Sequence, residues 1–396
     1  MPSHIVKSIP VTQKQVTDVD VLITRDGSCS IGCFHRFEVG AQPGDVAAHN
    51  EDIISIMNDF RKHSISRLNV TRGFYEKHMK YLRDIGITAL QSLGSHFIDN
   101  WAKYGDSERN ITAIVQAYPI LWEFFYSGPP HGAVDYYHFW GCHHRVTRRL
   151  LGVQGYPSRL DLPTHLLFCR NHRLAHWEKE RDALSELAEG GSDFSLVNLE
   201  DCFIDKSPED IVSDWDDLFF AACQSEDFGF IHIASHLNAD ENKMFFRSFL
   251  EISYHERLVK ILLRRLSAVD SDKEYFKFRQ KPLVFLNACK TMSTPEDLLR
   301  TQGFPDSFIK LGAGAVIATA CDIPDVFAMA FAKEFYRFFL DSPFMTASNA
   351  LRLARLFFLE KYNNPLGLAY GLYAHGDLMV QKRPPMDSYD HRQFGS

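Results

Sequence analysis

From about residue 111 onward, short apolar runs alternate with longer stretches in which apolar residues recur with a helical period. The apolar runs lie at residues 164–170, 194–199, 228–235, 282–288 and 313–320. Because these runs lack the alternation of a half-exposed strand, they predict strands that are buried on both faces. The pattern therefore predicts an α/β fold, with a mostly parallel, doubly wound sheet flanked by helices.

The first hundred residues have a different pattern. Two strand-like runs flank the dipeptide Asp26-Gly27, which is typical of a hairpin turn. Residues 71–97 then carry one apolar stripe at three- and four-residue steps, as in an amphipathic helix. We expect residues 1–110 to form a small α+β region, a hairpin plus helices, that packs on a second domain at residues 111–396.

Composition narrows the class of protein. The chain of 396 residues is 45% hydrophobic and 23% charged, so it can bury a large core. Its formal net charge of -7 leaves no basic stripe for nucleic acid. No apolar run approaches the roughly 20 residues that span a bilayer, and the first residues do not resemble a secretory signal. We expect a cytoplasmic protein that binds neither nucleic acid nor membrane.

Motifs for metals and phosphates are weak in this sequence. The eight cysteines include no CxxC pair, which favours reduced thiols. Residues 140–145 ("WGCHHR") and 168–176 ("FCRNHRLAH") gather Cys and His, but their spacing matches no standard zinc pattern. The glycines at residues 312–315 precede an apolar run, and no Gly-Lys-Ser/Thr follows them. We therefore expect no metal and no cofactor.

Two apolar runs end in side chains that can react. "FIHIASH" ends in His236 and "PLVFLNAC" ends in Cys289. In open parallel sheets ligands bind beyond the carboxyl ends of the strands, so the two side chains would face one crevice if their strands are neighbours. A cysteine beside an imidazole that takes its proton suffices for amide hydrolysis. His232 lies about 13 Å further back along the same strand, and we interpret it as structural.

The order of these residues resembles a known peptidase family. His236 precedes Cys289 by 53 residues, close to the spacing of about 50 in caspases. "FGFIHIASH", "PLVFLNACKT" and "FIKLGAGAVIATACDIPD" resemble, in this order, three blocks of CHAT-domain proteins. These proteins are the caspase-like, HetF-associated family of the clan of caspases, separases and gingipains. Further similar stretches are "AYPILWEFFYSG", "YYHFWGCHHRVTR", "ASNALRLARLFF" and "LAYGLYAHGDL", so that the resemblance covers about residues 110 to 380.

The resemblance implies a caspase-like fold and assigns roles to individual residues. Cys289 would be the nucleophile and His236 the general base and acid, while the backbone N–H groups of Leu237 and Cys289 would form the oxyanion hole. Leu237 stands where the family normally has Gly, and Cys321 stands where many members have Trp. The "AHG" around His375 resembles the family's His-Gly, but it follows Cys289 in the chain, so we interpret His375 as structural.

The resemblance also implies a substrate pocket. It would involve Asn287, the end of the first strand near Arg170, and the loop that begins at Asp322. A pocket dominated by Asp322 would favour a basic residue before the scissile bond, and one dominated by Arg170 an acidic residue. The sequence leaves both open, with a slight preference for a basic residue because neighbouring acids can neutralise Arg170.

The leading interpretation is a cysteine endopeptidase that cleaves a protein partner. By resemblance it would work in a prokaryotic defence or cell-death system, and a separate activating protein or ligand-sensing partner, or oligomerisation, would switch it on. The alternative is a caspase-like scaffold or regulatory module with weak or no catalysis, because a fold does not guarantee a function. A small-molecule hydrolase with the same dyad is a third, weaker class.

Overall fold

The computed structural model describes most of the chain, including the strands that carry the predicted site. The described residues are 17–23, 29–31, 36–37, 43–103, 107–115, 120–150, 153, 155–162, 164–190, 194–203, 218–225, 228–238, 249–255, 257–262, 266, 277–288 and 303–382. Cys289, the predicted nucleophile, lies outside these ranges, as do Asp26 and Gly27 of the predicted hairpin turn.

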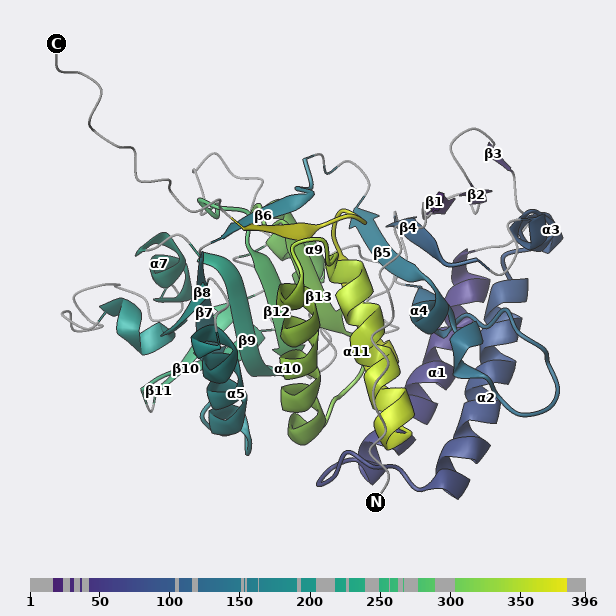
Figure 1. Ribbon diagram of the computed structural model, residues 1–396, viewed down its shortest axis with the longest axis horizontal. Coiled ribbons are helices and arrows are strands. Elements are labelled where there is room, and N and C mark those ends of the chain that lie inside the picture. The colour runs from purple at the N-terminus through teal and green to yellow at the C-terminus, as the bar shows by residue number, and fades with distance from the viewer. Residues whose placement is uncertain are drawn as a thin grey trace, which may run out of the picture.

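The centre of the molecule is a sheet with the strand order β8-β7-β9-β12-β13-β14 (Figure 1). The strands span Phe194–Asn198 (β8), Thr164–Arg170 (β7), Phe228–Asn238 (β9), Leu283–Ala288 (β12), Ala315–Thr319 (β13) and Tyr370–Tyr373 (β14). β8, β7, β9, β12 and β13 are parallel, and β14 is antiparallel to β13. The five apolar runs of the sequence form the five parallel strands, which confirms the predicted sheet.

Helices flank this sheet, as predicted. Three long helices lie side by side in front of it (Figure 1): Trp177–Glu189 (α5), Asp325–Asp341 (α10) and Ala347–Tyr362 (α11). Phe285 of β12 packs its ring against Phe335 and Tyr336 of α10, so burial of aromatic side chains holds this layer on the sheet. Two shorter helices, Leu218–Ser225 (α7) and Phe304–Lys310 (α9), contact each other through Phe219 and Phe308.

The predicted N-terminal hairpin extends the main sheet. Thr17–Ile23 (β1) pairs with Cys29–Ile31 (β2) in the antiparallel register of a hairpin, and Arg36–Phe37 (β3) follows at the edge. β1 also runs parallel to Arg109–Val115 (β4), which pairs with Arg145–Leu150 (β5), and β5 joins β14. One sheet thus includes thirteen of the described strands, and the expected boundary near residue 110 falls within β4.

The helical part of the N-terminal region has three helices. They span Pro43–His63 (α1), Arg72–Gln91 (α2) and Ser95–Lys103 (α3). Leu82 and Ala89 of the predicted stripe are buried on α2. The stripe is not one continuous helix, because Gly94 adopts a left-handed φ of 90° between α2 and α3, a conformation that glycine takes without steric cost.

A buried ion cluster joins β5 and α11 through Glu123. Arg148 of β5 donates to both carboxylate oxygens of Glu123 at 2.7 and 2.6 Å, and Nη2 of Arg355 of α11 lies 3.4 Å from Oε1. All three side chains are about 1% exposed. Burial alone would raise the pKa of Glu123, but Arg148 and Arg355 hold it below its ordinary value. The carboxylate therefore stays charged and links three elements distant in sequence.

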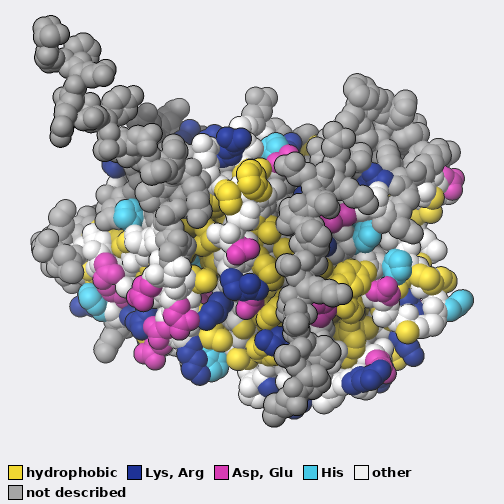
Figure 2. Space-filling view, in the orientation of Figure 1, with side chains coloured by type: hydrophobic (Ala, Val, Ile, Leu, Met, Phe, Trp, Pro, Cys, Tyr) yellow, Lys and Arg dark blue, Asp and Glu magenta, His cyan; other side chains and the backbone are white. Residues whose placement is uncertain are grey.

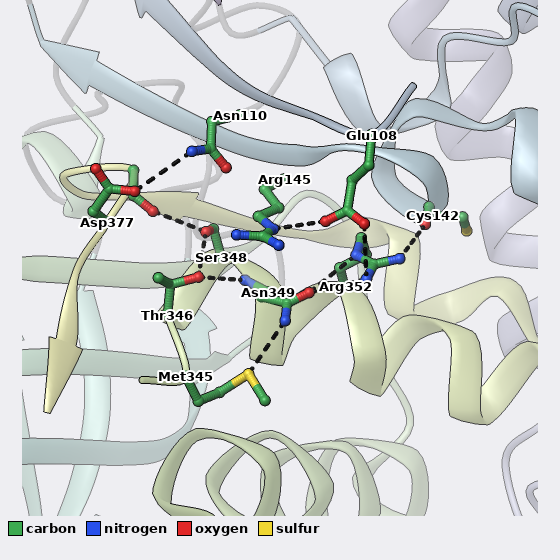
Figure 3. Close-up of polar contacts among 11 residues, drawn as sticks. Glu108, Asn110, Cys142, Arg145, Met345, Thr346, Ser348, Asn349, Arg352 and Asp377 are labelled. Carbon is green, nitrogen blue, oxygen red and sulfur yellow. Dashed lines mark hydrogen bonds and ion pairs between the residues drawn. The ribbon is translucent and has the colours of Figure 1, made fainter. Parts of the chain in front are cut away.

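Polar contacts fix the start of α11 (Figure 3). The hydroxyl of Thr346 accepts from the backbone N–H of Asn349 and caps the helix. Ser348 donates to the carbonyl of Gly376 at 2.9 Å, which holds α11 to the loop after β14. Glu108, next to β4, pairs with both Arg145 at 2.7 Å and Arg352 at 3.6 Å.

The other elements are short. They span Trp122–Phe124 (η1), Tyr136–His138 (η2), Trp140–His143 (α4), Arg159–Leu162 (β6), Leu199–Phe203 (η3), Phe249–Tyr254 (β10), Arg257–Leu262 (β11), Pro365–Ala369 (η7) and Met379–Lys382 (β15). β6 and β15 form a separate two-stranded parallel sheet. Within the described ranges, none of the helices has the length and apolar character needed to cross a membrane.

Candidate active site

The two strands that carry the predicted dyad are neighbours. β9 and β12 run parallel, and their register places Ser235 opposite Ala288. In the sequence the next residues are His236 and Cys289. His236 is described and partly exposed, whereas Cys289 lies outside the described residues. The condition that the sequence left open, that the two strands lie side by side, is met.

His236 lies where β9 changes partners. Up to Ala234, β9 pairs with β7 on one side, and from His236 onward it pairs with β10, so that His236 stands opposite Glu251. Because β7 and β9 lie at the point where the order of the parallel strands reverses, the crevice above them is the expected ligand site of a doubly wound sheet.

Leu237 has an extended backbone. It pairs with Leu250 of β10 within an antiparallel ladder. Among the described residues other than glycine, positive φ angles occur at His255 and Asn363, not at Leu237. Leucine therefore adopts this backbone without steric strain, and the family's glycine is not required for its conformation.

A small pocket opens beside His236, and we call it the site pocket. Its lining includes Glu180, Ser235, His236, Asn287, Ala288 and Asp325. The free volume is about 20 Å³, which is room for about one water molecule. Two of the lining side chains, Glu180 and Asp325, are carboxylates, contributed by α5 and α10.

Glu180 lies at the centre of a buried chain of hydrogen bonds. Asn287 donates its side-chain N–H to Oε1 of Glu180 and accepts from the hydroxyl of Tyr370 at 2.8 Å. Nε2 of His232 lies 2.9 Å from the same Oε1. The hydroxyl of Tyr336 lies 3.5 Å from Nδ1 of His232, and burial, then the charge of Glu180, raises the pKa of Tyr336 well above its ordinary value.

The fully buried His232 thus has packing and hydrogen-bonding partners inside the core. Its ring stacks between Phe168 and Phe285, with ring centres at 5.7 and 5.1 Å. This environment fits the structural role that we expected for it.

Arg170 and Asp322 lie beside the site pocket but are not among the residues that line it. The guanidinium of Arg170 pairs with Glu200 and lies 4.2 Å from the centre of the Trp177 ring. The carboxylate of Asp322 is 3.9 Å from Arg61. Of the predicted substrate-binding residues, the structure therefore brings Asn287 together with His236, and Arg170 is neutralised by its own partner.

The side chains of the two Cys and His clusters that could suggest a metal site are buried in neutral form or contact other residues. Burial raises the pKa of the Cys142 thiol to about 12, and burial together with His143 lowers the pKa of His144 to about 2, so both side chains are neutral. Nδ1 of His172 lies 2.6 Å from the hydroxyl of Ser253. In the part of the chain that the structure describes, no group of three or more His, Cys, Asp or Glu is arranged to hold a metal ion.

His375 is held in the loop after β14. Because β14 runs antiparallel to β13, this loop lies at the edge of the sheet opposite to the site pocket. Nδ1 of His375 accepts the backbone N–H of Asp377 at 3.2 Å.

Comparison with known families identifies the core. The family model of the CHAT domain matches residues 162–384, more than half of the chain. The chain belongs to the CHAT family. The match begins at β6 and ends after β15, so it includes both His236 and Cys289. No curated protein matches the chain.

Solved structures similar to this CHAT protein have low sequence identity. A complex of the pro- and mature domains of RgpB from Porphyromonas gingivalis is 10% identical, with 84% of this chain and 78% of that chain covered and a TM-score of 0.42. The Arg-specific cysteine proteinase gingipain R is 11% identical, with coverage of 94% and 80% and a TM-score of 0.41. The separase–securin complex of Saccharomyces cerevisiae is 10% identical, with coverage of 85% and 23% and a TM-score of 0.40.

Sequence reasoning missed two residues of the CHAT site pocket, Glu180 and Asp325. Glu180 had a detectable signal, because it shares the apolar face of its helix with Ala183 and Leu184. A carboxylate on the buried stripe of an amphipathic helix needs a partner, and such residues mark functional or structural networks. Asp325 had no such signal, since an acidic residue in a first helical turn is common.

Proposed function

We propose that this CHAT protein is a cysteine endopeptidase that uses Cys289 as nucleophile and His236 as general base and acid. The observation that carries the proposal is the parallel register of β9 and β12, which pairs Ser235 with Ala288, the residues that precede the dyad. The family match, which covers both residues, supports it as well.

The chemistry needs only this pair and backbone groups. His236 would take the proton of the Cys289 thiol, and the thiolate would add to the peptide carbonyl. The backbone N–H groups of Leu237 and Cys289 would stabilise the negative oxygen of the adduct. His236 would then give the proton to the leaving amine, and water would hydrolyse the thioester to release the acid and the free thiol.

The charges of the site pocket favour a basic residue before the scissile bond. Glu180 and Asp325 contribute carboxylates to its lining. Oε1 of Glu180 contacts His232 and Asn287, and Oδ2 of Asp325 accepts from the backbone N–H of Ala175. Arg170, the group that would favour an acidic residue, is paired with Glu200. We therefore propose lysine or arginine at this position.

The pocket must widen before such a side chain can enter, because about 20 Å³ does not hold a lysine or arginine. Activation by a separate protein or by a ligand-sensing partner agrees with the small volume of this pocket. We propose that the protein works in the cytoplasm, in a regulated prokaryotic defence or cell-death system, and cleaves a protein partner there.

Cleavage of candidate partners tests this function. The wild type and the Cys289→Ala, His236→Ala and His375→Ala variants are each incubated with the proteins encoded by neighbouring genes, alone and in pairs. We expect new fragments with the wild type and with His375→Ala, none with the other two, and cuts after Lys or Arg by mass spectrometry. Equal cleavage by Cys289→Ala would disprove the dyad, and cuts after other residues would disprove the preference.

A scaffold without turnover is the second candidate function, and the small volume of the site pocket is the observation that favours it. In that case the proteins encoded by neighbouring genes bind the wild type and Cys289→Ala with equal affinity, and no fragment forms in any combination. The same incubations therefore decide between the two functions.

A further inference from the structure

A groove crosses the outer surface of α5, α10 and α11, and we call it the three-helix groove. Its volume is about 340 Å³, much larger than that of the site pocket. Apolar side chains from α5, α10 and α11 contribute to its lining: Ala183, Met329, Ala330, Phe357, Phe358 and Tyr362. Figure 2 shows this side of the molecule, where hydrophobic side chains reach the surface around α10 between charged ones.

The carboxylates of the three-helix groove are neutralised within the chain. Each has a cation of this chain within ion-pair distance, so none of them repels an acidic ligand with its full charge. The pairs are Asp182 with Arg181 at 2.6 Å, Glu186 with Lys333 at 2.8 Å and Glu334 with Arg337 at 2.6 Å.

Two further lysines line the groove. Lys179 of α5 and Lys361 of α11 are exposed, and within the described residues neither forms an ion pair. The ammonium of Lys361 lies 4.9 Å from the centre of the Phe357 ring and 5.2 Å from that of Tyr362, so the cation stays over the apolar floor. The groove therefore combines apolar side chains with positive charge on both of its outer helices.

We propose that the three-helix groove binds an acidic amphipathic helix of a partner protein. Apolar side chains at helical spacing fill such grooves and supply the affinity. Glutamates or aspartates that flank this apolar stripe pair with Lys179 and Lys361, which gives the complex its orientation and its selectivity. A basic helix meets two unpaired lysines and is rejected.

The groove and the site pocket share two helices. On α5, Trp177 and Glu180 line the site pocket, whereas Lys179 and Asp182 line the groove. On α10, Ala328 lines the pocket and Met329 the groove. A helix that wedges into the groove moves α5 relative to α10 and widens the small pocket that both helices line. This consequence rests on the proposed peptidase function, whereas the binding itself does not.

Selection from a peptide library tests the binding without turnover. The target is the full chain with Cys289→Ala, and the library fixes apolar residues at positions i, i+3, i+4 and i+7 and varies the others among Glu, Lys, Ala and Ser. Ala330→Trp fills the groove, and Lys80→Trp, which adds the same side chain to an exposed position of α2, is the matched control. Thermal unfolding checks that both variants fold.

We expect enrichment of Glu over Lys in the selected peptides. Binding should fall about tenfold or more with Ala330→Trp and with the pair Lys179→Glu and Lys361→Glu, and stay unchanged with Lys80→Trp. Peptides with Lys in place of Glu should recover binding to the charge-reversed pair. No enrichment, enrichment of Lys, or equal binding to Ala330→Trp overturns the proposal. With the active protein, a bound peptide that leaves cleavage unchanged overturns only the effect on the pocket.

Discussion

The side-chain amide of Asn287 donates a hydrogen bond to Oε1 of Glu180, which joins the end of β12 to helix α5 at the site pocket. Glu180 is 5% exposed, and Nε2 of His232 from β9 also lies within hydrogen-bond distance of Oε1, at 2.9 Å. A buried carboxylate that is fixed from two strands has little freedom to turn away from the pocket that it lines.

Removing this charge should change substrate preference. We expect Glu180→Gln to lower kcat/KM for peptides with Lys or Arg before the scissile bond by on the order of 100-fold, because a buried cation then loses its partner. Peptides with a neutral residue at that position should change much less. Glu189→Gln, at the exposed end of α5, is the control. An equal loss for both peptide classes would show that Glu180 supports the fold rather than specificity.

Leu237 offers a test of the oxyanion hole. Its backbone is extended and paired with Leu250, so glycine has no conformational advantage there. We expect Leu237→Gly to change kcat by only a few-fold and to lower the free energy of unfolding by about 1 kcal/mol, the cost of glycine in a strand. Urea unfolding and steady-state rates measure both effects. A rise in kcat of about tenfold or more would contradict this account of the site.

The buried ion cluster should be essential for stability. Glu123→Gln leaves Arg148 and Arg355 buried without a carboxylate, and we expect it to lower the free energy of unfolding by about 3 kcal/mol or more at pH 7. Because the pKa of Glu123 is lowered in the folded protein, the wild type loses this stabilisation as the pH falls below the ordinary value of about 4.3.

Urea unfolding of the wild type and Glu123→Gln at pH 7 and in acid measures both parts of this prediction. The difference in stability should narrow on acidification. A difference that grows in acid would mean that the carboxylate is not held in its charged form. The Arg148→Lys variant is a useful control, since it keeps the charge but loses the two-point contact with Glu123.

Local patterns in the sequence predicted the central sheet, because each buried strand is marked by a continuous apolar run of only a few residues. The five apolar runs become β7, β8, β9, β12 and β13, whereas the adjacency of β9 and β12, which the sequence left open, was established by the structure. The sequence could place His236 and Cys289 at the carboxyl ends of two such strands, where ligands of a parallel sheet bind.

Contacts between distant segments could not be predicted in the same way. Asn287 and Glu180 are 107 residues apart, and Glu123 and Arg355 are 232 residues apart. A local pattern of apolar and polar residues therefore gives no indication of either contact. The hairpin strand β1 joins the main sheet through β4, about ninety residues later in the chain. Asp322 and Asp325 lie in one short stretch, and only the packing of α10 decides which of them lines the pocket.

The reactivity of Cys289 tests the central claim most directly. The wild type and His236→Ala are treated with iodoacetamide near neutral pH, and mass spectrometry follows the rate at each of the eight cysteines. Cys202, which is half-buried, serves as the internal reference. We expect Cys289 to react about tenfold faster than Cys202 in the wild type, and to lose this advantage in His236→Ala, because the imidazole supplies the thiolate. A Cys289 that reacts no faster than Cys202, or equally fast without His236, would contradict the dyad.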